Sequence, residues 1–204
     1  MSLSNQQLKT LQAYRQKKFR REDGVFVAET PKVVEMLLAS PLNLRGLYAL
    51  PDYAETVARR FPACVPQLTV ISEKELTRIS GLTSPQSVFG IWEQPHRRLA
   101  PGETFHGLSL VLDGLQDPGN LGTIIRIADW FGIDRLICSE DTADAFQPKC
   151  VQASMGAVAH LPIYYVDLSR TAAEAPDGFP FYGTFLEGEN LFSQPLTATD
   201  AWYC

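Results

Sequence analysis

The hydrophobic and polar positions follow two periods that alternate along the first half of the chain. Short apolar runs rich in Val, Ile, Leu and Phe predict strands, and apolar residues three or four positions apart predict helices. The predicted strands span residues 25–28, 44–50, 67–71 and 88–92. The predicted helices span residues 8–19, 31–38, 52–61 and 73–81. This alternation of strands and helices indicates a small α/β layer structure.

Local signals mark where two of these helices begin. Thr30 and Pro31 supply an N-cap and a proline at the first helical position. The run from Ser72 to Glu75 is a capping box. Both signals support the predicted pattern.

The second half of the chain follows a stretch without apolar periodicity. Residues 94–107 contain two prolines and two glycines, which is typical of a linker. Residues 108–112 then form a strongly apolar run, as in a strand buried on both faces. The further predicted elements are strands at 135–138, 161–166 and 181–186 and helices at 121–131 and 148–159. Parallel α/β architecture is expected again.

The composition is that of a globular protein. The chain has 204 residues, 45% hydrophobic and 20% charged, which suits one large or two small domains. It contains no apolar run long enough to span a bilayer, and its N-terminus does not resemble a signal peptide. We therefore expect a cytoplasmic protein with no membrane association.

The cysteines and histidines do not indicate a metal site. The four cysteines, Cys64, Cys138, Cys150 and Cys204, form no C-x-x-C pair, and the three histidines do not cluster with them. Buried thiols are expected, and we predict no metal.

Charge is distributed unevenly over the chain. The net charge is −5, yet residues 1–21 carry six basic residues and no acidic one. The remainder therefore holds 12 of the 18 basic residues against all 23 acidic ones. A local basic patch on an acidic body is typical of nucleic-acid binding, while a solvated helix face is the alternative.

The most informative loop follows the strand at residues 108–112. Ligands of parallel sheets bind outside the carboxyl ends of the strands. Asn120 is a candidate N-cap for the next helix, Gly122 permits close approach of a backbone or ligand, and Arg126 lies four residues further on the same helix face. This arrangement favours a phosphate-containing partner. The alternative is a structural turn with Arg126 in a salt bridge.

The string Asn120-x-Gly122-x-x-x-Arg126-x-Ala128, after a strand that leads into Asp113, resembles the first motif of a known family. The family is that of the SpoU, or TrmH-like, RNA 2′-O-ribose methyltransferases, within the SPOUT superfamily. The chain matches this motif in residue type and spacing.

Three further segments resemble the same enzymes in the same order. Residues 148–157, followed by a strand at 161–163, resemble the family's small-residue helix and strand. Residues 17–29 and 83–86 resemble the N-terminal substrate-binding domain of many members, which has a ribosomal L30e-like fold. The resemblance thus spans essentially the whole chain.

The resemblance implies an α/β fold in two parts. An L30e-like domain is expected at residues 1–95, a linker at 96–106, and a parallel-sheet SPOUT domain of the trefoil-knot type at 107–204. Family members continue with a further loop and helix that complete the knot and most of the cofactor pocket. We expect this knot-forming segment to be absent from the 204 residues. The chain also departs from the family pattern at Thr30, Ser87 and Gln152.

The resemblance also implies a function. The expected activity is S-adenosylmethionine-dependent methylation of a ribose 2′-hydroxyl in tRNA or rRNA, with the 204 residues inactive on their own. Arg126 and Asn120 are the implied catalytic residues. Thr184, Leu186 and Gly188 are expected at the cofactor pocket. Because an arginine guanidinium stays protonated, we expect Arg126 to grip a phosphate and stabilise a developing alkoxide.

The implied partners are RNA and a second copy of the chain. RNA contacts are expected from a set of basic residues, namely Lys17, Lys18, Arg20, Arg21 and Arg126. Family members are usually dimers through the second domain, so a homodimer is expected. The competing hypothesis is a noncatalytic RNA-binding protein whose second domain only dimerises.

Overall fold

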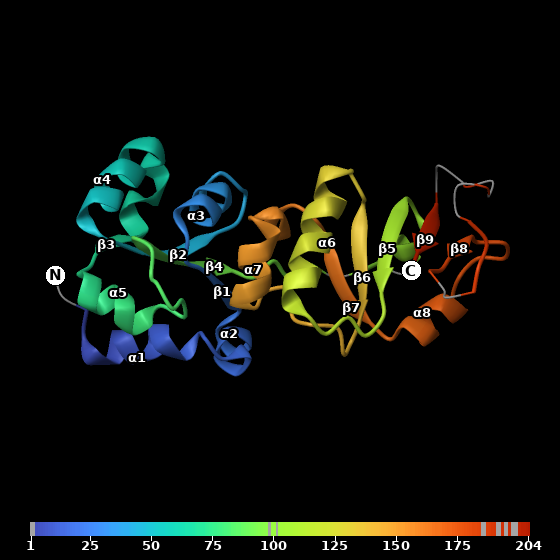
Figure 1. Ribbon diagram of the computed structural model, residues 1–204, viewed down its shortest axis with the longest axis horizontal. Helices are drawn as coiled ribbons and strands as arrows, with labels where there is room; N and C mark the ends of the chain where they lie inside the picture. The colour runs from blue at the N-terminus through green and yellow to red at the C-terminus, as the bar shows by residue number, and fades with distance from the viewer. Residues whose placement is uncertain are drawn as a thin grey trace.

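Two sheets lie one after the other along the long axis of the molecule (Figure 1). The computed structural model describes residues 3–97, 99–100, 102–184, 187–190, 193, 196 and 200–204. Helices α7 and α6 stand between the sheets, with α7 nearer the N-terminal sheet (Figure 1). Helix α7 packs against β1 and so joins the two halves of the chain.

The N-terminal sheet has four strands in the order β1-β4-β2-β3. Strand β4 is antiparallel to both of its neighbours, and β2 and β3 are parallel. The strands are β1 (Val25–Ala28), β2 (Leu44–Ala49), β3 (Leu68–Val70) and β4 (Val88–Glu93). The helical segments are α1 (Asn5–Ala13), α2 (Lys17–Asp23), α3 (Pro31–Leu38), α4 (Pro51–Arg60), the 3₁₀ turn η1 (Pro62–Gln67) and α5 (Glu73–Ile79). The predicted strands and the predicted capping box at Ser72 are confirmed.

The single helix predicted over residues 8–19 was wrong, because the chain forms two helices there. Ser4 begins α1 with its own capping box, and the helix ends before Tyr14. The Arg20 side chain donates hydrogen bonds to the carbonyls of Tyr14 and Arg15, each at 3.1 Å. The break between the helices is thus stabilised by a residue of the second helix, because its guanidinium satisfies carbonyls that a helix would otherwise pair.

The C-terminal sheet has five strands in the order β7-β6-β5-β9-β8, and every pair is parallel. Its strands are β5 (Leu108–Leu112), β6 (Arg135–Ser139), β7 (Ile163–Val166), β8 (Phe181–Tyr182) and β9 (Ala201–Tyr203). Its helical segments are η2 (Glu103–Phe105), α6 (Pro118–Trp130), α7 (Pro148–Ser154), η3 (Ala157–Ala159) and α8 (Leu168–Ala173). Helices α6 and α7 pack on one face, while α8 and Phe105 pack on the other. The predicted parallel α/β architecture is confirmed.

The helix predicted at residues 148–159 was also wrong in extent. Met155 and Gly156 have positive φ angles of 53° and 92°, so α7 ends at Ser154. A Cβ at Gly156 would lie 2.7 Å from the Cβ of Met36 in α3. The turn therefore lets α3 of the first half approach the end of α7, which glycine alone allows without a clash.

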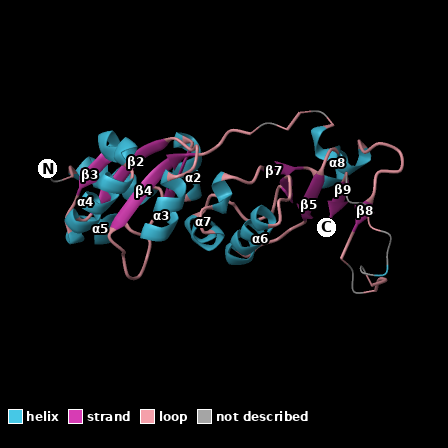
Figure 2. Ribbon diagram, turned by 90° about the horizontal axis from the view of Figure 1, so that it is seen from above, coloured by secondary structure: helices cyan, strands magenta, loops and turns pink. Residues whose placement is uncertain are grey.

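The segment at residues 94–107 leads from β4 to β5 and passes along the outside of the molecule (Figure 2). The last turn of this segment, however, packs against the second half of the chain. Trp202 donates from its indole nitrogen to the Thr104 carbonyl at 2.9 Å, and its ring stacks on Phe105 at a centroid distance of 5.6 Å. In the described ranges, no helix has the length and apolarity needed to cross a membrane.

The two halves share a hydrophobic core. Val151, Val158 and Ala159 are buried in the same cluster as Phe26 and Trp92 of the N-terminal sheet. Arg20 and Asp144 form an ion pair at 2.9 Å across this boundary, with side chains only 2% and 15% exposed. Thr30 also donates to the Gln152 side chain at 3.2 Å. Packing and polar contacts therefore fix the two halves relative to one another.

We expect Arg20→Ala to destabilise the protein by about 3–5 kcal/mol, because it leaves the Asp144 carboxylate buried without its partner. Unfolding in urea measures this loss. Arg170→Ala removes the exposed pair with Glu174, and we expect it to change stability by at most about 0.5 kcal/mol. Equal effects of the two substitutions would show that the Arg20 pair does not hold the halves together.

Candidate functional site

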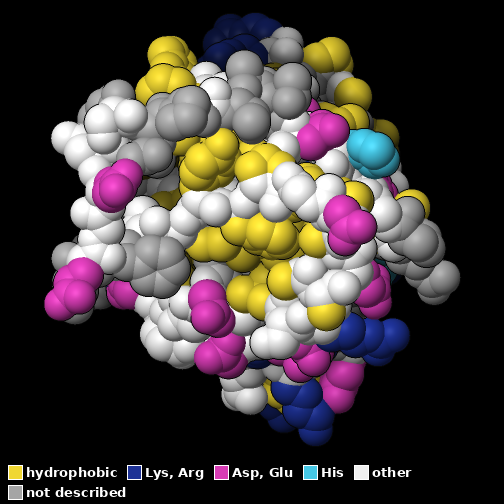
Figure 3. Space-filling model, turned by 90° about the vertical axis from the view of Figure 1, so that its right-hand side faces the viewer, with side chains coloured by type: hydrophobic (Ala, Val, Ile, Leu, Met, Phe, Trp, Pro, Cys, Tyr) yellow, Lys and Arg dark blue, Asp and Glu magenta, His cyan; other side chains and the backbone are white. Residues whose placement is uncertain are grey.

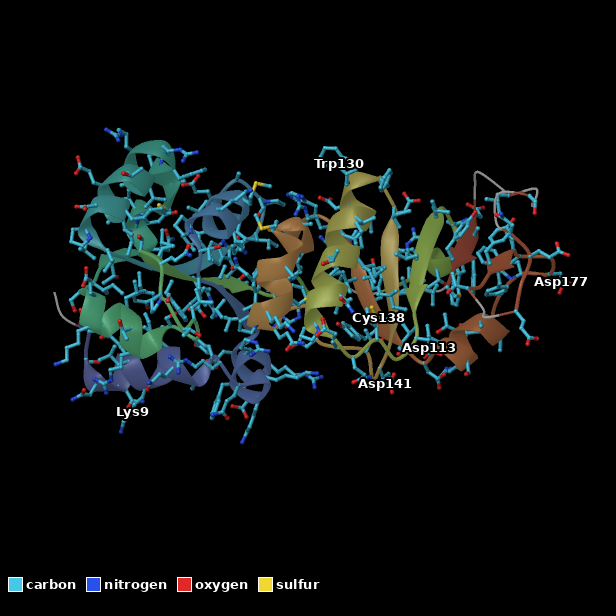
Figure 4. The ribbon with its side chains drawn as sticks, viewed as in Figure 1. Lys9, Asp113, Trp130, Cys138, Asp141 and Asp177 are labelled. Atoms are coloured by element: carbon cyan, nitrogen blue, oxygen red, sulfur yellow. The ribbon has the colours of Figure 1, made fainter. Side chains whose placement is uncertain are left out.

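The carboxyl edge of the C-terminal sheet carries the loop that the sequence singles out. Asp113 and Asp141 lie at this edge, in the loops after β5 and β6 (Figure 4). Cys204 follows β9 at the same edge, and the charge of Asp113 contributes to the raised pKa of its thiol, after burial as the main cause. The ends of β5, β6 and β9 thus meet where ligands of parallel sheets bind.

Polar side chains tie the loops after β5 and β6 to one another. The Ser139 hydroxyl accepts from the Gly114 amide at 2.8 Å and donates to Asp141 at 2.6 Å. Gln116 donates to the carbonyls of Gly114 and Asp141 at 3.1 and 2.8 Å. These residues were not predicted from the sequence, since their partners lie about 25 positions away. They hold the edge in one conformation, as a binding site requires.

Helix α6 begins three residues earlier than its predicted start at Leu121, and its cap is not Asn120. Asp117 is the N-cap, Pro118 occupies the first helical position, and Asp117 accepts from the Asn120 amide at 2.8 Å. This hydrogen bond and the neighbouring ammonium of Lys149, at 2.9 Å, lower the pKa of Asp117. Asp117 takes the cap because its carboxylate reaches the third amide of the helix while proline needs no amide partner.

The Asn120 side chain consequently takes no part in the helix cap. It is exposed and makes no hydrogen bond with another residue of the described ranges. Arg126 is likewise exposed, and no ion pair or hydrogen bond joins it to the part of the chain that the structure describes. The alternative of a structural turn held by an Arg126 salt bridge is therefore not supported within the described residues.

Gly122 allows α6 to pack closely against α7, and this packing fixes the helix that carries Arg126. A Cβ at Gly122 would lie 2.6 Å from the Cys150 carbonyl and 2.9 Å from the Ser154 amide of α7. The predicted close approach is thus to a backbone. Gly119, Gly122 and Arg126 share one face of α6, because they are spaced by three and four residues. The glycines allow α6 and α7 to touch, and Arg126 continues the same face.

The predicted cofactor residues are only partly described. Thr184 follows β8, and both its amide and its hydroxyl donate to the Cys204 carbonyl, at 2.9 and 3.1 Å. Gly188 is exposed, with no atom within 4 Å of the position of a Cβ. Leu186 lies outside the described residues. Hydrophobic side chains gather on the surface at this end of the molecule (Figure 3), and Phe181 is 46% exposed.

The basic N-terminal residues do not all lie on the surface. Lys17, Lys18 and Arg21 are exposed, as an RNA contact requires. The expected RNA contact at Arg20 was wrong, because its side chain is buried and paired with Asp144. The sequence could not distinguish it from its neighbours, since its partner lies 124 positions away.

The thiols are not candidate nucleophiles. Cys64, Cys138 and Cys150 are buried, as expected, whereas Cys204 is exposed and departs from that prediction. Burial raises the pKa of Cys138 and of Cys150 to about 12, so both stay protonated at neutral pH. No cluster of three or more potential metal ligands occurs among the residues that the structure describes.

This geometry defines a class of two-part α/β proteins with a parallel sheet and an exposed arginine on the helix that begins at its carboxyl edge. Residues 107–203 match the SpoU rRNA Methylase family, and residues 5–90 match the MRM3-like substrate binding domain. The chain is 30% identical over 190 residues to the Bacillus subtilis 23S rRNA (guanosine(2553)-2′-O)-methyltransferase RlmP, with 91% of this chain and 73% of that protein covered. The chain therefore belongs to the SpoU rRNA methylase family.

Other relatives and solved structures agree with this assignment. The Xenopus laevis mitochondrial rRNA methyltransferase 3 is 33% identical over 72% of this chain, which spans 36% of that relative. A TrmH-family putative RNA methyltransferase from Porphyromonas gingivalis superposes with a TM-score of 0.78 at 33% identity, covering 98% of this chain and 79% of that one. An AdoMet-bound rRNA methyltransferase from Sinorhizobium meliloti has a TM-score of 0.81 at 27% identity, covering 100% and 79%. The resemblance seen in the sequence is confirmed.

Proposed function

We propose that the protein transfers a methyl group from S-adenosylmethionine to a ribose 2′-hydroxyl of ribosomal RNA. The observation that carries the proposal is the free guanidinium of Arg126 on α6, the helix that begins at the carboxyl edge of the sheet and packs through Gly122 against α7. The bacterial relatives RlmP and RlmB, by name, methylate a guanosine of 23S rRNA. A guanosine of 23S rRNA is therefore the proposed substrate, and tRNA is the alternative.

A noncatalytic RNA-binding protein is the less favoured function. It would need no free asparagine and arginine on the helix that begins at the edge of the sheet, and the relatives are methyltransferases by name. The domain boundaries at residues 95 and 107, the trefoil knot and a cytoplasmic location stay predictions.

The chain's own residues supply positioning and charge. The cofactor, when bound, supplies a methyl group on a positively charged sulfur. Thr184, exposed at the ends of β8 and β9, offers one open wall that fits part of such a ligand. Arg126 would bind a phosphate next to the target ribose and stabilise the negative charge that develops on the 2′-oxygen as its proton passes to water. The side-chain carboxamide of Asn120, which takes no part in the helix cap, would orient the same strand of RNA.

Chemical mapping of the product tests the reaction. The native protein, purified from the organism that produces it, is incubated with unmodified 23S rRNA and S-adenosylmethionine labelled in the methyl group. We expect label in a single nucleotide whose 3′ phosphodiester resists alkaline hydrolysis, because that cleavage needs a free 2′-hydroxyl. Label on a base, or no label in rRNA, would refute the proposed reaction.

We expect Arg126→Lys to lower kcat strongly while the affinity for S-adenosylmethionine stays nearly unchanged. Lysine keeps the charge but loses the planar fork that grips a phosphate in two places. Single-turnover kinetics and cofactor titration separate the two effects. Loss of cofactor binding would instead place Arg126 in the cofactor pocket.

We also propose that the 204 residues alone bind the cofactor weakly and are inactive. Thr184 and Gly188 are exposed, so a ligand against them is covered on one side, whereas tight small-molecule sites enclose most of the ligand. Calorimetric titration of the 204-residue chain with S-adenosylmethionine should show affinity weaker than about micromolar. Tight, saturable binding would show that the described residues already enclose a site.

A homodimer is proposed through the exposed end of α6. Ile127, Trp130 and Phe131 are 50%, 84% and 74% exposed, and Trp130 projects from the end of the helix (Figure 4). Contiguous exposed aromatic side chains of this kind mark interaction surfaces. We expect Trp130→Glu to shift the protein from dimer to monomer in sedimentation equilibrium. A monomeric wild-type protein, or an unchanged dimer in the variant, would contradict this surface.

A further inference from the structure

Three cavities adjoin along the boundary between the two halves of the chain. The first, of about 550 Å³, lies between β1, the end of α5 and the starts of α6 and α7. The second, of about 230 Å³, shares Arg15 and Pro148 with the first. The third, of about 580 Å³, shares Lys17 and Asp144 with the second. We call this row of adjoining cavities across the boundary the seam groove.

Positive charge predominates along the seam groove. Its exposed cations are Arg15, Lys17 and Arg21 from the first half and Lys149 of α7, whose ammonium also pairs with Asp117 at 2.9 Å. A further guanidinium group, that of Arg97, lines the third cavity. The groove therefore presents a cationic surface within a protein of net charge −5.

Most carboxylates that line the groove already have a hydrogen-bond or ion-pair partner within the protein. Glu29 accepts from the Ser80 hydroxyl and the Gly81 amide, and Asp144 is paired with Arg20. Glu140 is exposed in the third cavity and remains as an acceptor. Carboxylate oxygens in such a groove suit base edges that carry N–H donors.

Apolar walls accompany the charges at both ends of the groove. Val27, Leu82 and Ala153 line the first cavity, and Pro95 and Tyr164 line the third. Flat apolar surfaces beside cations are what an unstacked nucleic-acid strand requires, since its bases need a face to lie on and its phosphates need a positive charge. A duplex keeps its bases stacked inside and would use only the cations.

We infer that the seam groove binds a single, unstacked strand of the RNA substrate, with phosphates on Lys17, Arg21 and Lys149 and one base in each large cavity. The volumes of the first and third cavities fall in the range of small-ligand sites. The identity of the strand as substrate rests on the proposed function. The groove adds Lys149 and Gln152 of the second half to the RNA contacts, and it leads from the basic helix α2 to Gly119 at the start of α6.

Substitutions that remove one positive charge, either inside or outside the groove, test the proposal on the full 204-residue chain. The probe is a fluorescent oligouridylate about ten nucleotides long, bound at several salt concentrations. We expect Lys149→Ala and Lys17→Ala each to weaken binding several-fold and to reduce the slope of log affinity against log salt by about 0.7. Lys74→Ala, on the exposed side of α5, removes the same charge outside the groove and should leave both quantities unchanged. Thermal unfolding of each variant checks that it folds.

Cross-linking gives a second measurement that needs no variant. An oligonucleotide with 4-thiouridine is irradiated on the wild-type chain, and the linked peptides are identified by mass spectrometry. Links on both sides of the boundary are expected, near Leu82 in the first half and near Ala153 or Tyr164 in the second. Cross-links confined to one half of the chain would overturn the groove. So would a loss of oligouridylate affinity in Lys74→Ala equal to that in the groove variants, or an RNA duplex that competes equally well for binding.

The outcome is separable from that of the methylation assay. Methyl transfer to rRNA without any effect of Lys149→Ala on binding would reject the groove and keep the proposed function. The expected binding pattern with no methyl transfer would keep the groove and reject the function.

Discussion

The buried ion pair between Arg20 and Asp144 is the contact on which the arrangement of the molecule depends. A buried charge is tolerated only with a partner, so the folded structure requires Arg20 and Asp144 to meet. The same guanidinium ends α1 by binding the carbonyls of Tyr14 and Arg15. One residue therefore stabilises both the break between α1 and α2 and the contact between the two halves of the chain.

Helix α7 carries this constraint to the carboxyl edge of the second sheet. On one side it buries Val151 in the core of the N-terminal half, and on the other it packs backbone to backbone against Gly122 of α6. Lys149, at its start, also pairs with the Asp117 cap of α6. Because α6 carries Asn120 and Arg126, the first half of the protein positions the candidate catalytic groups through a chain of direct contacts.

Most strands and helices could be predicted from the sequence, because their patterns are local. The features that could not be predicted depend on partners distant in the chain. The break near Tyr14 depends on Arg20 and through it on Asp144, and the end of α7 depends on the approach of Met36 to Gly156. The cap of α6 is different, since the Asp117-Pro118 pair is itself a signal for a helix start.

The site residues likewise divide into those that local sequence predicts and those that depend on distant partners. The motif around Gly122 and Arg126 is visible in sequence because each residue type is required by backbone approach or by charge. Arg20 and Lys17 look alike in sequence, yet one is buried and the other exposed, since only the fold brings Asp144 to one of them. Lys149 was not predicted as an RNA contact, because its neighbours in sequence carry no charge and Arg15, the cation that lines the same cavity, is distant in the chain. An acidic protein can hold an RNA strand at such a place because the cations gather in one groove, while the acidic remainder of the surface repels RNA elsewhere.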